Sequence, residues 1–173
     1  MSERRRTPVA ALVALVAVLV IAAGLAAWFR GEANQLWDSG SAQNTALVDV
    51  GTTAQVAGQV GDALETVYSY DFSRLDENER AARQVITGKF AGDFGELFGQ
   101  VRELAPPQQA VVTATVASAA VKVLDGDRAT VVVFLDQQAT RGVDAEQLVA
   151  AGRLTVSAER VGGRWKIADV DSN

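Results

Sequence analysis

The sequence of 173 residues contains no cysteine and no histidine. The lack of cysteine excludes disulfide bonds, thiolate nucleophiles and thiolate metal ligands. The lack of histidine removes the commonest general base near neutral pH and the commonest ligand of transition metals. Catalysis would have to use carboxylates, tyrosines or serines, and no glycine-rich phosphate loop follows a strand pattern. We therefore expect a protein that is not an enzyme and that holds no metal or cofactor.

Positive charge is scarce beyond the first 30 residues. From Gly31 onward the sequence has 20 acidic and 12 basic residues, which gives a net charge of −8. Proteins that bind nucleic acids gain most of their affinity by neutralising phosphates with basic side chains. An acidic chain without a basic stripe argues against nucleic acid as a partner.

One long run without charge predicts a transmembrane helix near the N-terminus. The run extends from Thr7 to Phe29, and as a helix residues 9–29 span about 30 Å, the thickness of the bilayer hydrocarbon. Three arginines precede the run and one follows it, which favours a cytoplasmic N-terminus and an exported remainder. The alternative is a cleaved signal peptide, whose apolar region is shorter, about 7–15 residues.

We therefore expect a single-pass protein of the cell membrane whose C-terminal domain is extracytoplasmic. The bilayer itself is then one partner of the chain. The expected segments are a short cytoplasmic basic segment at 1–7, a transmembrane helix at 8–29, a stalk or linker at 30–45, and an extracytoplasmic α+β domain at 46–173.

Apolar residues that recur every three or four positions predict two helices in the exported domain. The first covers Leu47 to Val67, and the second runs from about Asp76 to Val101. The "APP" at 105–107 is expected to end the second helix, because proline breaks a helix interior. The apolar stripes are Leu47, Val50, Ala54, Ala57, Val60, Leu64 and Val67 in the first helix, and Val85, Phe90, Phe94, Leu97 and Val101 in the second.

Beyond residue 109 the pattern changes to strands. Asp125-Gly126 stands between two strand-like runs, and Asp-Gly in that position is the strongest short-range hairpin signal. A two-residue loop there pairs Val116 with Leu135, and Ser118 with Val133. The first two strands are therefore expected to form an antiparallel hairpin.

A second hairpin follows a looser segment at 139–151. Its turn is Gly162-Gly163, and its register pairs Glu159 with Lys166, which is a favourable pair of opposite charges. Two helices followed by four antiparallel strands predict an α+β domain, with the helices packed on one face of a curved four-stranded sheet. The strand residues expected to cover the helices are Leu154, Val156, Ala158, Trp165 and Ile167.

Several motifs in one order resemble the Mce-associated membrane proteins of actinobacteria. They are the basic N-terminus, one apolar helix, "YSYDFSRLD" from Tyr68, "ARQVITGKF" from Ala82 and "VGGRWKIADVDS" from Val161. The resemblance implies an exported domain similar to the nuclear-transport-factor-2-like or SnoaL-like cone, which is also described as cystatin-like. It also implies a non-enzymatic accessory subunit that stabilises or assembles an Mce-type lipid import complex, with the subunits of that transporter as partners.

Two other functions remain open. Type IV secretion channels also use single-pass subunits with cone-like exported domains, so a scaffold in such a channel is one alternative. The other is a binder of small apolar ligands, including lipids, or an isomerase that uses the pocket of the cone. That second alternative requires a closed apolar pocket with Asp71 or Asp136 facing inward.

The candidate site residues allow a functional and a structural interpretation. Tyr68, Tyr70 and Asp71 form either an acid–base site, with Asp71 as base and Tyr70 as donor, or a packed corner in which Asp71 holds the turn toward Ser73. Asp136 either points into a pocket or is solvated near a strand end. In the same way, Trp165 either lines a lipid cavity or caps the core.

Overall fold

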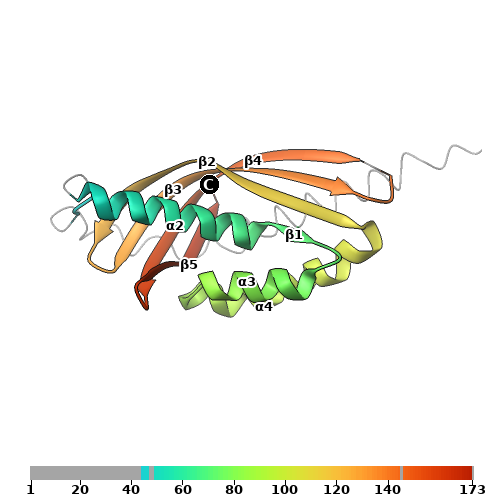
Figure 1. Ribbon diagram of the computed structural model, residues 1–173, viewed down its shortest axis with the longest axis horizontal. Helices are drawn as coiled ribbons and strands as arrows, with labels where there is room; N and C mark the ends of the chain where they lie inside the picture. Colours follow the sequence, from blue (N-terminus) through green and yellow to red (C-terminus); the bar gives the residue numbers. More distant parts are fainter. Residues whose placement is uncertain (1–43, 47–48, 145, 173) are drawn as a thin grey trace, which may run out of the picture.

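The computed structural model describes residues 44–46, 49–144 and 146–172 (Figure 1). The expected cytoplasmic segment, the transmembrane helix and most of the linker lie outside these residues. Among the helices that the structure describes, none has the length and the apolar character needed to cross a membrane.

In the part of the chain that the structure describes, three helices pack on a curled antiparallel sheet of five strands in the order β1-β2-β3-β4-β5. In Figure 1 the sheet arches over α2, and α3 and α4 lie together below it. The α+β class and the curved sheet are confirmed. The elements in chain order are α2 (Val50–Tyr68), β1 (Tyr70–Asp71), α3 (Leu75–Val85), α4 (Gly88–Gln108), β2 (Ala110–Asp125), β3 (Arg128–Arg141), β4 (Gln147–Val161) and β5 (Arg164–Ser172).

The sheet has five strands and not the predicted four. The additional strand is β1, in which Tyr70 pairs with Val112 and Asp71 pairs with Val111. Two residues are too few to produce an alternating pattern, so the sequence offered no periodic signal for this strand.

The predicted second helix is in fact two helices, α3 and α4. Between them Ile86 forms a parallel bridge with Ile167 of β5, and the Thr87 N–H donates to the Ile167 carbonyl at 2.7 Å. Gly88 then starts α4 with a φ of 55°, a conformation that glycine adopts without the strain of a side chain. Contacts with β5 therefore divide a segment that the spacing of its apolar residues predicts to be one helix.

The predicted end of the second helix at "APP" is also wrong. Pro106 and Pro107 lie inside the last turn of α4, which continues to Gln108. The fixed φ of proline, near −65°, matches a helix. The chain leaves the helix at Gln109, which has a left-handed φ of 49° and whose N–H donates to the carbonyls of Ala105 and Pro106.

The first hairpin is shifted from its predicted register. Val116 pairs with Leu135 as expected, but Ser118 pairs with Phe134 and not with Val133. A β-bulge lies between Val116 and Ser118, and each bulge adds one residue to one strand. The predicted pairing therefore holds on one side of the bulge only.

The turn of this hairpin is Gly126-Asp127 and not Asp125-Gly126. Asp125 pairs with Arg128, and Gly126 has a φ of 56° at the first position of the two-residue loop. A second bulge lies between Val121 and Val123. The displaced turn shifts the pairing next to it, and the two bulges shift the pairing back along the strands. The predicted partner of Val116 is therefore correct although the predicted turn is not.

In the second hairpin the pairing of Glu159 with Lys166 is confirmed. The segment at 139–151, predicted to be loose, instead completes two long strands. Arg141 closes their connection, because its N–H donates to the Glu146 carbonyl at 3.0 Å and its guanidinium pairs with Asp144 and Glu146. The five residues expected to face the helices from β4 and β5 are all buried.

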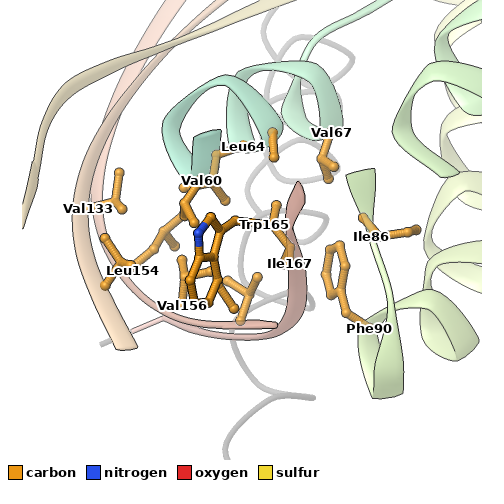
Figure 2. Packing of buried hydrophobic residues seen from close by; sticks show 14 of the residues in the cluster. Val60, Leu64, Val67, Ile86, Phe90, Val133, Leu154, Val156, Trp165 and Ile167 are labelled. Carbon is orange, nitrogen blue, oxygen red and sulfur yellow. The ribbon is translucent and has the colours of Figure 1, made fainter. Parts of the chain in front are cut away.

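The core lies between α2, the inner face of the sheet and the start of α4 (Figure 2). In α2 the face that packs on the sheet includes Val56 and Ala63 in addition to the expected Val60, Leu64 and Val67, whereas Val50 is 71% exposed. Val50 belongs to the first turn and lies outside this contact. In α4 the buried rings are Phe90, Phe94 and Phe98.

Side chains of α2 cover part of the outer edge of β2. Glu65 Oε1 accepts a hydrogen bond from the Val116 N–H at 2.8 Å, and Ser69 Oγ accepts one from the Ala114 N–H at 2.9 Å. An uncovered backbone N–H inside a protein costs about as much as a lost hydrogen bond. These two side chains therefore complete an edge that β1 covers for only two residues.

At three glycines in the helices there is room for a side chain. A Cβ added to Gly58, Gly92 or Gly99 would meet nothing within 4 Å. Since glycine in a helix interior is less stable than alanine by about 0.5–1 kcal/mol, replacing all three by alanine should raise the free energy of unfolding by about 1.5–3 kcal/mol. Urea unfolding measures this gain.

A matched control is Gly88→Ala, which should lower the free energy of unfolding. Gly88 has a positive φ, and a Cβ there would lie 3.3 Å from the Ala168 carbonyl oxygen. A triple alanine variant that is no more stable than the parent would contradict the prediction.

Candidate functional site

Asp71 lies at the corner between α2 and α3, and its carboxylate is engaged locally. Its Oδ1 accepts hydrogen bonds from the Ser73 N–H at 2.9 Å and from the Ser73 hydroxyl at 2.7 Å, and its Oδ2 lies 3.5 Å from Arg74. The bonds from Ser73, aided by Arg74, lower the pKa of Asp71. A carboxylate with a lowered pKa is a poor general base, and this one holds the turn, as the structural interpretation predicts.

The two tyrosines of the corner pack against the core. Burial raises the pKa of Tyr68 strongly and that of Tyr70 in the same direction. Both phenols therefore stay protonated at neutral pH, and the rings contribute apolar contact where α2 meets β1. Tyr70 and Asp71 themselves form the short strand β1.

Asp136 lies on the outer face of the sheet. It alternates with the buried Val133 and Leu135 and shares its face with Phe134, which is 50% exposed. Its carboxylate therefore faces away from the helices. Since Asp71 sits in the corner and Asp136 on the outer face, the inward-facing acid that the isomerase alternative requires is not provided by either residue.

Trp165 is a core residue of β5. Its side chain is 3% exposed, and Figure 2 shows the ring among Val60, Leu154 and Val156. Its backbone N–H donates to Gln59 Oε1 of α2 at 2.8 Å, so the residue fixes α2 on β5. The indole Nε1 is buried without a hydrogen-bond partner.

Asp169 of β5 lies near Lys89 and Asp93 of α4, and not on the face of Trp165 and Ile167 that the sequence pattern indicates. A bulge between the pairs of Ser157 and Ala158 makes Asp169 face away from Trp165, although strict alternation from Trp165 predicts the same face. Burial raises the pKa of Asp169; Lys89 opposes this effect, whereas Asp171 and Asp93 add to it. The sequence contains no signal for this bulge.

An ionic network joins α3 to α4. Arg102 pairs with Asp76 at 2.6 Å and with Glu79 at 2.7 Å, and Glu79 also pairs with Arg83 at 2.7 Å. Arg102 and then Arg83 lower the pKa of Glu79 by hydrogen bonding. The network contains two acids and two bases, and it ties α3 to α4.

Within residues 44–46, 49–144 and 146–172 there is no group of three or more carboxylates that could hold a metal ion. The five candidate residues occupy three separate environments: the corner for Tyr68, Tyr70 and Asp71, the outer face for Asp136, and the core for Trp165. These five residues therefore contribute packing in the core and at the corner, and contact with solvent on the outer face.

Two carboxylates should respond to pH in opposite directions. Asp71 has a lowered pKa in the folded state, so its stabilising effect is present above its unfolded pKa of about 3.9 and is lost as the pH falls through the folded value. Asp169 has a raised pKa, so its cost is absent below about 3.9 and grows as the pH rises through the folded value. Asp71→Asn should lower stability at pH 7, and Asp169→Asn should raise it.

Urea unfolding at pH 7 and at pH 3 measures both effects, which we expect to be below about 1 kcal/mol because the two groups are partly solvated. At pH 3 each variant should approach the parent. An Asp169→Asn variant that is less stable than the parent at pH 7 would show that the ionised form is favoured in the fold. Asp136→Asn serves as the control on the outer face.

The comparisons with known proteins give relatives in sequence and in structure. No protein-family model matches the chain. The chain is 30% identical over 159 residues to the uncharacterized protein Rv1362c of Mycobacterium tuberculosis, which covers 90% of this chain and 67% of the relative. It is 29% identical over 136 residues to the outer membrane protein Rv1973 of the same organism, which covers 78% of this chain and 82% of the relative.

Two solved structures share the fold. An IcmL-like type IV secretion system protein from Legionella pneumophila matches with a TM-score of 0.59 and 12% identity, over 69% of this chain and 91% of that one. CagV from Helicobacter pylori, a VirB8 homolog of the type IV secretion system, matches with a TM-score of 0.56 and 13% identity, over 69% and 97%. At such low identity the likeness is one of fold.

Proposed function

The chain belongs to the same family as the uncharacterized protein Rv1362c of Mycobacterium tuberculosis, and from this premise we propose that it is a membrane-anchored, non-enzymatic scaffold subunit of a multi-subunit complex in the cell envelope. The observation that carries the proposal is the fold shared with two components of type IV secretion systems. The name of the relative Rv1973, an outer membrane protein, supports a location in the envelope. The apolar run at 8–29 would supply the anchor, with the N-terminus in the cytoplasm.

Two envelope systems are candidates for this role. The resemblance to Mce-associated proteins favours a lipid importer, with the exported domain as a nuclear-transport-factor-2-like cone. The solved structures favour a channel of the type IV secretion kind, because their likeness extends over more than two thirds of the chain. The structural likeness thus supports the channel-type scaffold more directly than the lipid importer, and both share the same architectural role.

The placement of the candidate residues also supports a scaffold. The Asp71 carboxylate accepts a hydrogen bond from the Ser73 hydroxyl, and Asp136 lies on the outer face of the sheet. Neither carboxylate is therefore placed to act on a ligand enclosed by the sheet. A scaffold instead needs a stable domain with an accessible surface. The long β3–β4 hairpin, which extends past α2 in Figure 1, provides such a surface.

A pulldown of the tagged full-length chain from its native membrane, followed by mass spectrometry, tests the proposal. We expect the retained proteins to include the subunits of one envelope complex. Recovery of secretion-channel subunits would establish the channel-type scaffold, and recovery of Mce-type subunits would establish the lipid importer. Recovery of the chain alone, with a lipid or another small molecule bound, would overturn the scaffold role.

The matched control replaces residues 1–30 by an unrelated single-pass anchor. If the partners bind the exported domain, they remain bound to this variant. If they bind the transmembrane helix, they are lost. Either result identifies the part of the chain that docks.

A further inference from the structure

Several positions on both edges of the sheet, within the described residues, are covered by hydrogen bonds from other elements. On β2, beyond the bonds from Glu65 and Ser69, the Leu124 N–H donates to Asn44 Oδ1 at 3.0 Å and the Leu124 carbonyl accepts from the Thr45 N–H at 2.8 Å. The opposite edge of the sheet is β5. There the Thr87 N–H and Gln59 Oε1 bond to the backbone of Ile167 and Trp165.

A further stretch of open edge lies on β4. β4 is longer than β5, and their pairing ends where Leu154 meets Ser172. From Gln147 to Arg153, β4 therefore has β3 on one side only. Within the described part of the chain, no hydrogen bond from another element reaches the other side of these seven residues.

This open edge, residues 147–153, lacks the usual protection against pairing. Natural edge strands are protected by proline, by lysine or by bulges, and the sequence "QLVAAGR" contains no proline, no lysine and no bulge. Arg153 is its only charged residue. Val149 is 74% exposed, so apolar surface lies beside unpaired backbone groups.

We propose that a second copy of this chain pairs with the open edge, antiparallel and about a two-fold axis at Ala150. This register places Val149 of one copy opposite Ala151 of the other, and Leu148 opposite Gly152. At each of these two pairs a larger apolar residue thus faces a small one. The two five-stranded sheets would join into one continuous sheet, and such a contact is self-complementary and closed.

The charges at the two ends of the open edge favour this occupant. Arg153 of one copy faces Gln147 of the other, and Glu146 follows next along the chain. No like charges oppose each other across the axis, whereas a parallel arrangement in register would place Arg153 against Arg153. Directly opposed like charges destabilise a strand pair, so the antiparallel arrangement is preferred. This inference does not depend on the proposed scaffold role.

The chain has no native cysteine, so a single introduced cysteine reports on the contact. In the full-length Ala150→Cys variant the two introduced thiols face each other across the axis, since directly opposed residues have Cβ atoms about 4.5–5.5 Å apart. Mild oxidation in the native membrane should give a disulfide-linked dimer of the chain. Thr113→Cys, which is exposed on the outer face of β2 away from this edge, is the control for random collision and should stay monomeric.

Charged substitutions on the outer face of the open edge test the same pairing independently. A chain with Val149→Glu and Ala151→Glu, and another with Val149→Lys and Ala151→Lys, each place like charges across the axis. Each should associate with itself at least about tenfold more weakly than the parent, and mixing the two should restore a mixed dimer. An Ala150→Cys variant that stays monomeric, or that cross-links to a different protein, would overturn the proposal; the second result would assign the edge to an extended segment of that protein.

Discussion

Replacing Phe90 by alanine should lower the free energy of unfolding by about 3–5 kcal/mol. Phe90 is 1% exposed, and its ring lies beside Ile86 and Ile167 in Figure 2 and 6.2 Å from the ring of Phe94. Truncation removes apolar contacts and leaves a cavity where the start of α4 meets β5. Because the total stability of a domain is about 5–15 kcal/mol, this single change removes a large part of it. Urea unfolding followed by circular dichroism measures the loss.

The matched control for this prediction is Phe134→Ala. The chemical change is the same, but Phe134 is 50% exposed on the outer face of β3. Its cost should stay below about 1 kcal/mol, in the range of surface substitutions with partial contact. Equal costs for the two variants would contradict the assignment of the core to the inner face.

Replacing Glu65 by alanine should lower the free energy of unfolding by about 1–3 kcal/mol. Its carboxylate accepts the hydrogen bond of the Val116 N–H, and Val116 is next to a bulge where regular pairing is interrupted. Without Glu65 this half-buried N–H loses its acceptor. Hydrogen exchange at the Val116 amide should accelerate along with the drop in stability, and the two measurements together separate this bond from a general loosening.

Glu65→Gln is the informative comparison. The glutamine amide keeps an oxygen at the same position but loses the negative charge, and hydrogen bonds to charged groups are roughly twice as strong as neutral ones. We expect about half of the alanine effect. If glutamine and alanine were equally costly, the side-chain oxygen would not be the group that matters.

Local patterns predicted much of the fold, because many elements here are specified by short-range chemistry. Gly162-Gly163 places two positive φ values where a two-residue hairpin loop needs them, and the pairing of Glu159 with Lys166 follows directly. The amphipathic period of α2 likewise predicted Val60 and Leu64 as core residues. In these cases the sequence pattern and the tertiary contacts agree.

The errors occur where distant contacts determine the backbone. Ile86 leaves the helix because Ile167, 81 residues later, offers it a strand partner. Gly88 suits a break at this point, but it does not reveal that partner. The bulges after Val116 and before Asp169 likewise change which face a residue takes without any local marker. A face assignment based on alternation alone is therefore correct only as far as the next bulge.

The candidate site was predictable only in part. The grouping of Tyr70 with Asp71, and the turn toward Ser73, follow from residues that are close in sequence. The outward direction of Asp136 depends on which face of β3 meets the helices, and the sequence alone left both faces open. The open edge of β4 is a difference in length between two strands, and this difference was hidden because 139–151 was interpreted as loose.

β5 is the last element along the chain, and this place in the sequence affects how the protein folds. Gln59 of the first described helix bonds to Trp165, which follows 106 residues later, and Trp165 and Ile167 fill the centre of the core. During synthesis α2 therefore emerges long before β5, which is one of the strands on which it packs. Proteins dominated by such distant contacts fold slowly, since a long chain segment must be ordered before the contact forms. We therefore expect the domain to complete its folding only after β5 has been made.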